Sequence, residues 1–130
     1  MSNSIFGALN FSIRVVHSNQ SQHNKDRARL DTILDYIAQN YRRHVSIEEI
    51  AGIAYLQPGY FCRFFKKVLG KSPITYLNEY RIKQACILLQ TTDLPIMEVG
   101  MDCGFFHLGN FMKEFKKYTE TTPLQYRKKS

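Results

Sequence analysis

The sequence predicts an all-α fold made of two similar halves joined by a long helix. Apolar residues recur at the three- and four-residue spacing of an amphipathic helix, beginning with Leu30, Ile33 and Ile37. After residue 29 there is no alternating run of β-branched residues, so no sheet is expected in the main body. The second half repeats the first, which indicates an internal duplication.

Residues 1–28 are expected to form a flexible segment ahead of a domain that spans residues 29–130. Ser18–Asp26 is polar and shows no periodicity. The apolar stretch before it, Ile5–His17, is too short and too interrupted to span a membrane. That stretch fits an arm, a sequence added by cloning, or the end of an upstream domain.

The first half of the domain, residues 29–71, contains three predicted helices. The first carries the apolar stripe that runs from Leu30 to Tyr41. Ser46 and Glu49 have the spacing of a capping box and begin a short second helix. Pro58 suits the first turn of the third helix, whose buried side is expected to consist of aromatic residues: Phe61, Phe64 and Phe65.

A single long helix is expected over residues 73–90. Gly70 ends the preceding helix, Pro73 begins the new one, and no helix breaker follows until Thr91–Pro95. At about 1.5 Å per residue this helix is roughly 27 Å long.

The duplication is visible in the spacing of matching residues. Phe61 and Phe111 are 50 positions apart, as are Pro73 and Pro123. Upstream of these helices the offset is 49, so one extra residue lies between Phe105 and Phe111, in the turn between two helices. The second half, residues 91–128, is therefore expected to repeat the helices of the first, with Phe111 and Phe115 buried.

Composition limits the possible functions. The chain has 130 residues, with 18 Lys and Arg against 11 Asp and Glu, a net charge of +7 that favours a polyanionic partner. A large multidomain enzyme is excluded by length. The three cysteines form no C-x-x-C pair, which indicates neither a disulfide scaffold nor a zinc module and fits a reducing, cytoplasmic setting.

Each half has the layout of a helix-turn-helix, in which the second helix enters the major groove of DNA. The face opposite the phenylalanines carries the candidate base-reading residues, which are Gly59, Cys62 and Arg63 in the first half and Gly109, Asn110 and Lys113 in the second. Arg63 has the fork that pairs with guanine, and Asn110 the amide that pairs with adenine. Candidate phosphate contacts are the lysine pairs near the helix ends, Lys66, Lys67, Lys116 and Lys117.

Taken together, these motifs resemble the DNA-binding domain of the AraC/XylS family of bacterial transcription regulators. The matching residues extend from Ile33 to Arg127 and include Tyr60-Phe61-x-Arg63-x-Phe65-Lys66, Gly70-Lys71-Ser72-Pro73, Phe111-x-x-x-Phe115-Lys116-Lys117 and Thr122-Pro123-x-x-Tyr126-Arg127. The resemblance implies two helix-turn-helix subdomains joined by a linker helix, which bind double-stranded promoter DNA and usually activate transcription through RNA polymerase. A small-molecule effector is implied only if a further domain lies upstream, and this chain by itself is expected to be monomeric.

The sequence departs from the family pattern at four positions. Tyr55 stands where glycine is common, so the first turn is expected to differ locally because tyrosine disfavours positive φ. Gln57 replaces the usual serine cap, Gly100 the usual alanine, and Glu120 a glycine that often ends the second reading helix. These changes are expected to weaken the cap and the second subdomain and to leave the reading faces in place.

Other residues have structural interpretations. Arg81 lies on the apolar stripe of the long helix, where a charge requires a partner, so we expect an ion pair with a carboxylate such as Glu49 or Glu98. Cys103 and His107 lack further ligands nearby, so no metal is expected. No nucleophile–base pair is recognisable, and we expect neither an enzyme nor a cofactor.

Two other binding functions remain open. One is a helical module that docks on RNA polymerase or another protein with little DNA specificity. RNA binding would require exposed stacking aromatics, which the sequence does not place at recognisable positions. Binding to a DNA groove depends steeply on salt, whereas a largely apolar protein interface does not.

Overall fold

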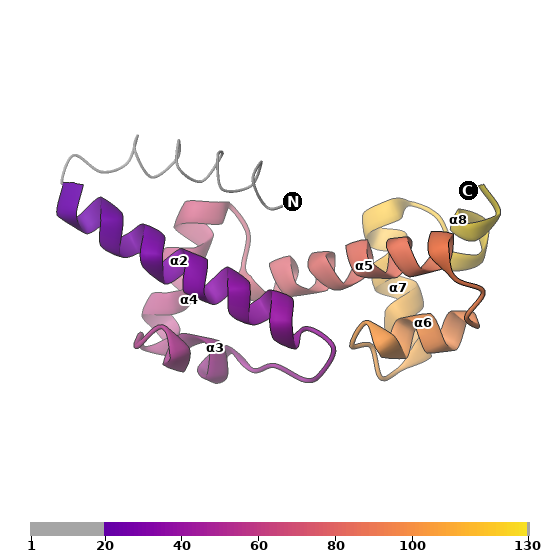
Figure 1. The fold of residues 1–130 in the computed structure, drawn as a ribbon, viewed down its shortest axis with the longest axis horizontal. Coiled ribbons are helices and arrows are strands. Elements are labelled where there is room, and N and C mark those ends of the chain that lie inside the picture. Colours follow the sequence, from indigo (N-terminus) through magenta and orange to yellow (C-terminus); the bar gives the residue numbers. More distant parts are fainter. Residues whose placement is uncertain (1–19, 130) are drawn as a thin grey trace. The chain divides into compact units, whose positions relative to one another are not determined.

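A computed structural model describes residues 20–129, and every regular element in that span is a helix. The predicted all-α fold is confirmed. The helices are α2 (Gln20–Asn40), α3 (Ile47–Ile53), α4 (Pro58–Leu69), α5 (Pro73–Thr91), α6 (Ile96–Asp102), α7 (Leu108–Thr119) and α8 (Pro123–Lys129) (Figure 1).

The helix α2 begins earlier than the apolar pattern indicates. The expected flexible segment is wrong from Gln20 onward, and residues 1–19 lie outside the described residues. Asp26 is only 3% exposed, accepts a hydrogen bond of 2.8 Å from Gln22 Nε2, and lies 3.8 Å from Arg29 Nη1. Polar side chains three and four residues apart support a helix without an apolar stripe, which is why the sequence pattern missed this part.

The described residues divide into two compact units. The first unit combines α2 up to Ala38 with Ser46–Pro73, and the second combines Gln39–Val45 with the chain from Ile74 onward. The sequence treats residues 73–90 as a connector between two subdomains. In the structure nearly all of α5 instead belongs to the second unit, because Leu77, Ile82 and Leu89 are buried in it.

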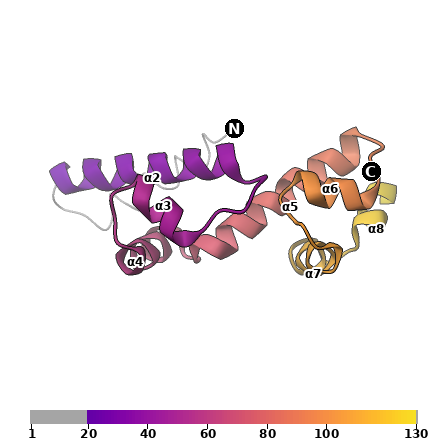
Figure 2. The ribbon, with the colours of Figure 1, turned by 90° about the horizontal axis from the view of Figure 1, so that it is seen from below.

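In the first unit, α3 and α4 contact each other and form the predicted helix-turn-helix (Figure 2). Ser46 Oγ accepts a hydrogen bond of 3.0 Å from the Glu49 amide, which confirms the predicted cap. The Glu49 carboxylate accepts a hydrogen bond from the Tyr36 hydroxyl and thereby joins α3 to α2. The predicted apolar stripe of α2 is buried, with Ile33 and Ile37 fully inaccessible.

In the second unit, Arg81 on α5 holds the main chain that follows α2. Its Nε donates to the Tyr41 carbonyl and its Nη2 to the Arg43 carbonyl, both at 2.8 Å. The Phe105 ring centroid lies 6.0 Å from the Arg81 guanidinium carbon. Burial lowers the pKa of Arg81 from its usual value.

The prediction that Arg81 forms an ion pair with a carboxylate is therefore wrong. Glu49 accepts its hydrogen bond from Tyr36, and Glu98 is exposed. Carbonyl groups at the C-terminus of a helix lack partners within it, so they accept from a buried guanidinium as a carboxylate would.

The turn between α6 and α7 passes close to Arg81 at Gly104. The φ angle of Gly104 is +97°, and a Cβ there would lie 2.6 Å from Arg81 Nε. Only glycine fits this position.

The residue that matches Gly104 in the first unit is Tyr55, which has φ 59° and is 94% exposed. The expectation that tyrosine avoids positive φ and alters the turn locally is wrong. Because the Tyr55 side chain points into solvent, the strain of its positive φ is confined to its own backbone.

The helices α4 and α7 end in the same way, each at a residue with positive φ. Gly70 ends α4 with φ 79° and Glu120 ends α7 with φ 65°, each donating its amide to a lysine carbonyl one turn earlier. Glutamate at position 120, where the family often has glycine, therefore ends the helix with the same backbone conformation and adds backbone strain.

We expect Arg81→Met to lower the free energy of unfolding by about 2–4 kcal/mol, because two carbonyls lose a charged donor inside the protein. Thermal denaturation followed by circular dichroism measures the change. Lys83→Met, at an exposed position of the same helix, serves as the matched control with little effect. An unchanged melting temperature for Arg81→Met would contradict the assigned role.

We expect Glu120→Gly to stabilise the protein by about 1 kcal/mol, since glycine adopts positive φ without steric cost. Glu120 is exposed and makes no side-chain hydrogen bond or ion pair with the described residues. Gly70→Ala tests the same constraint in the opposite direction, because a Cβ there meets nothing within 4 Å and only the backbone is affected. Melting temperatures that move in the same direction for both variants would refute the argument.

Candidate nucleic-acid interface

The helix α4 presents one face to the core and the opposite face to solvent. Phe61, Phe64 and Phe65 are buried, as predicted. The Phe61 and Phe65 ring centroids are 5.7 Å apart at an interplanar angle of 62°, which fixes the rotation of the helix. Pro58 occupies the first turn and Gln57 makes no capping hydrogen bond, so the predicted weak cap is confirmed.

The outward face of α4 carries the base-reading residues predicted for the first half. Gly59 and Arg63 are exposed, and Cys62 is half-buried. The Arg63 guanidinium extends over Gly59, since a Cβ at Gly59 would lie 3.5 Å from Arg63 Nη1. Arg63 makes no hydrogen bond or ion pair with any residue in the described part of the chain, so its planar donors are available to a ligand.

The helix α7 repeats this arrangement in the second unit. Phe111 and Phe115 are fully buried, with ring centroids 5.7 Å apart at 70°. His107 precedes the helix and makes no capping hydrogen bond. At about 100° of rotation per residue, Gly109 and Lys113 lie opposite the buried rings.

The structure also fixes the register between the two reading helices. They begin at Pro58 and Leu108, 50 residues apart, whereas α3 and α6 begin 49 apart, at Ile47 and Ile96. The extra residue therefore lies in the turn before α7, as predicted, and leaves the register within α7 unchanged. Lys113 corresponds to Arg63.

Under this register Asn110 and Met112 lie on opposite edges of the outward face. Asn110 is exposed and corresponds to Tyr60, on the same edge as Lys117. Met112 corresponds to Cys62 and was missed by the sequence interpretation, although the 50-residue offset that pairs the phenylalanines also pairs these two residues. Its side chain is 37% exposed.

The outward faces of both reading helices are basic and carry no exposed carboxylate. The helix α4 contains no Asp or Glu, and the single acidic residue of α7, Glu114, is buried. Glu114 Oε1 has no hydrogen-bond partner in the described structure, and the matching position in α4 is Phe64. A polyanion that approaches either face therefore meets only positive or neutral side chains.

The predicted phosphate contacts are placed near the C-terminal ends of the reading helices. Lys66 and Lys67 on α4 are exposed, as are Lys116 and Lys117 on α7. Lys117 Nζ lies 5.5 Å from the Tyr118 ring centroid, and the other three make no hydrogen bond, ion pair or ring contact with described residues. Their placement on two exposed edges suits contacts to a backbone that runs beside each helix.

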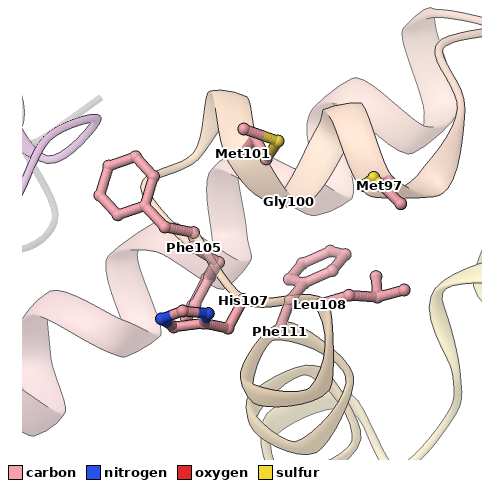
Figure 3. A pocket seen from close by; sticks show the side chains of 8 residues that line it. Met97, Gly100, Met101, Phe105, His107, Leu108 and Phe111 are labelled. Atoms are coloured by element: carbon pink, nitrogen blue, oxygen red, sulfur yellow. The ribbon is translucent and has the colours of Figure 1, made fainter.

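An apolar hollow of about 240 Å³ lies between α6 and α7 (Figure 3). Met97 and Met101 on α6 face Leu108 and Phe111 on α7, with His107 at the edge. Met97, Met101 and Leu108 are each more than 40% exposed. The matching positions in the first unit are Glu48, Gly52 and Pro58, so the helix-turn-helix fold itself does not require this apolar surface.

The described residues form no recognisable reactive-thiol or metal-binding site. Cys103 is fully buried, and burial raises its pKa to about 12, so the thiol stays protonated. Over residues 20–129 no three His, Cys, Asp or Glu side chains are grouped so that they could hold a metal ion. None of the helices in that span is long and apolar enough to cross a bilayer.

Comparisons with known proteins agree with this geometry. A family described as a helix-turn-helix domain matches residues 50–129. The chain is 34% identical over 104 residues to the uncharacterized HTH-type transcriptional regulator YijO of Escherichia coli, covering 80% of this chain and 37% of that protein. A similar regulator of Bacillus subtilis, YdeC, is 33% identical over 100 residues, or 77% of this chain and 34% of that protein. The chain thus spans about a third of the length of these relatives.

Solved structures give the same result. The C-terminal domain of the two-component response regulator yesN of Fusobacterium nucleatum superposes with a TM-score of 0.71 at 33% identity, over 75% of this chain and 95% of that one. An AraC-type transcriptional regulator of Chromobacterium violaceum gives 0.75 at 27% identity, over 79% and 92%. The DNA-binding domain of AdpA, crystallised in complex with a target DNA, gives 0.74 at 27% identity, over 77% and 90%. By the family match over residues 50–129 and its relatives, the chain belongs to the AraC/XylS family of transcription regulators.

Proposed function

We propose that the chain regulates transcription by reading two segments of the DNA major groove, one with α4 and the other with α7. As a family member it binds DNA and is not an enzyme. The observation that carries the finer proposal is that both helices turn a face without exposed carboxylates outward while paired phenylalanines hold the opposite face in the core. The related AdpA domain was crystallised in complex with a target DNA, which supports DNA as the ligand.

Base contacts and phosphate contacts are assigned to different residues. Arg63 donates two hydrogen bonds to a guanine in one segment, and Lys113 and Asn110 contact bases in the other. Gly59 and Gly109 allow close approach of the helix backbone to the bases, and Cys62 faces the first segment. The four lysines neutralise phosphates and add affinity without sequence information.

The regulatory step is proposed to be activation through contact with RNA polymerase. The exposed apolar side chains of Met97, Met101 and Phe106 support a protein contact on the second unit, because isolated basic domains gain nothing from exposing such a cluster to water. Docking on a protein without specific DNA binding is the second candidate function, and the same cluster favours it.

Selection from a randomised duplex library of about 30 base pairs separates these two functions. We expect the wild-type chain to enrich two short motifs. Arg63→Ala should relax one motif, and Lys113→Ala or Asn110→Ala the other, each weakening binding by roughly 5- to 150-fold. Lys83→Ala, an exposed lysine on α5, is the matched control and should leave both motifs intact. Failure to enrich any sequence would favour the protein-docking function.

We also expect affinity to fall linearly with the logarithm of salt concentration, because phosphate contacts release counterions. Replacing Lys66 and Lys67 by glutamine should reduce the slope by about 1.8, and the same change at Lys116 and Lys117 should have a similar effect. The double variant Lys25→Gln with Lys83→Gln removes equal charge at exposed sites elsewhere. Equal slopes for the reading-helix variants and this control would contradict the assignment of phosphate contacts.

A further inference from the structure

The two reading faces differ in their apolar content. In α4 the edge of the outward face carries Pro58 and Cys62, whereas the matching edge of α7 carries Leu108 and Met112. Leu108 and Met112 are 44% and 37% exposed, on a face whose other residues are glycine, asparagine and lysine. The two helices share one fold, so this difference concerns what each of them contacts.

Of these two side chains, Met112 is the one available to a ligand in the groove. Leu108 lines the hollow together with Met97 and Met101, so part of its surface faces that hollow (Figure 3). Met112 does not line the hollow. It lies one turn after Gly109 and one turn before Lys116 on the outward face, while Phe111 and Phe115 fill the core behind it.

The major groove offers one apolar group for such a side chain, the 5-methyl group of thymine. Methionine suits this contact, because its unbranched thioether adapts to the surface of a base edge. Glycine at position 109 brings the helix axis close to the bases, which places a side chain three residues later within reach of the same groove segment.

We propose that Met112 is a specificity-determining residue that contacts the 5-methyl group of a thymine in the segment read by α7. This inference rests on the proposed reading of DNA by α7. It gives the two half-sites different chemistry: a guanine selected by Arg63 hydrogen bonds in one, and a thymine selected by apolar contact in the other.

Substitution of thymine by uracil tests this contact, because uracil keeps the hydrogen-bonding groups of thymine and lacks only the methyl. In the selected duplex, each thymine of the second motif is replaced singly by uracil and the dissociation constant is measured. We expect one position to weaken wild-type binding by about fourfold, the value for burial of one methyl group.

The effect at that position should disappear in Met112→Ala, which binds the thymine and uracil duplexes equally. Met101→Ala removes an exposed methionine from α6 and should retain the fourfold difference. Met112→Gln keeps the length of the side chain and should shift the preferred base from thymine toward adenine. Circular dichroism checks that each variant is folded, as is expected for exposed positions.

Two results would overturn the inference and leave the reading of DNA intact. One is specific binding in which no thymine of the second motif responds to uracil. The other is a uracil effect that persists unchanged in Met112→Ala. Absence of any selected duplex would overturn the proposed function itself, and the Met112 contact with it.

Discussion

Paired phenylalanines decide which face α4 and α7 each turn outward. In α4 and α7 two fully buried rings one helical turn apart pack edge to face with the same centroid separation, 5.7 Å. A helix held at two points along one side has no freedom to rotate, so the opposite side is fixed as the outward face. Arg63 and Lys113 are exposed because the buried rings hold the opposite side of each helix in the core. The residues on the outward face can therefore change without disturbing the core.

The two units keep this arrangement and differ around it. At the turn before the reading helix, Gly104 leaves room for Arg81 and the Tyr41 carbonyl, whereas Tyr55 extends into solvent. The second unit thus uses its turn as part of the packing around Arg81, and the first unit does not. A second arginine repeats the device, since Arg127 donates to the carbonyls of Leu89 and Thr92 at the end of α5. In both cases a guanidinium from a later helix binds main-chain carbonyls at or just after the end of a long helix.

The sequence predicts the helices and the core well because both follow from local periodicity. Ser46, Pro58, Gly70 and Pro73 mark helix ends through chemistry that acts within one turn. The partners of Arg81 could not be found this way, because main-chain carbonyls carry no residue-specific signal and lie about 40 positions away. The start of α2 was missed because its first turns are supported by polar pairs such as Gln22 and Asp26. The exposure of Met112 was not predicted, since apolar residues on a basic helix resemble core residues in sequence.

Gly100 has a consequence for how this protein can evolve. A Cβ on Gly100 would lie 2.7 Å from Cδ2 of Phe111, the ring that orients the second reading helix. The matching pair in the first unit, Ala51 and Phe61, accommodates that methyl group, and both residues are fully buried. The two copies thus pack the same pair of positions differently, and a single substitution of glycine by alanine does not convert the second arrangement into the first. Alanine at position 100 becomes acceptable only after the Phe111 ring has moved, so the order in which the two sites change determines which intermediates survive.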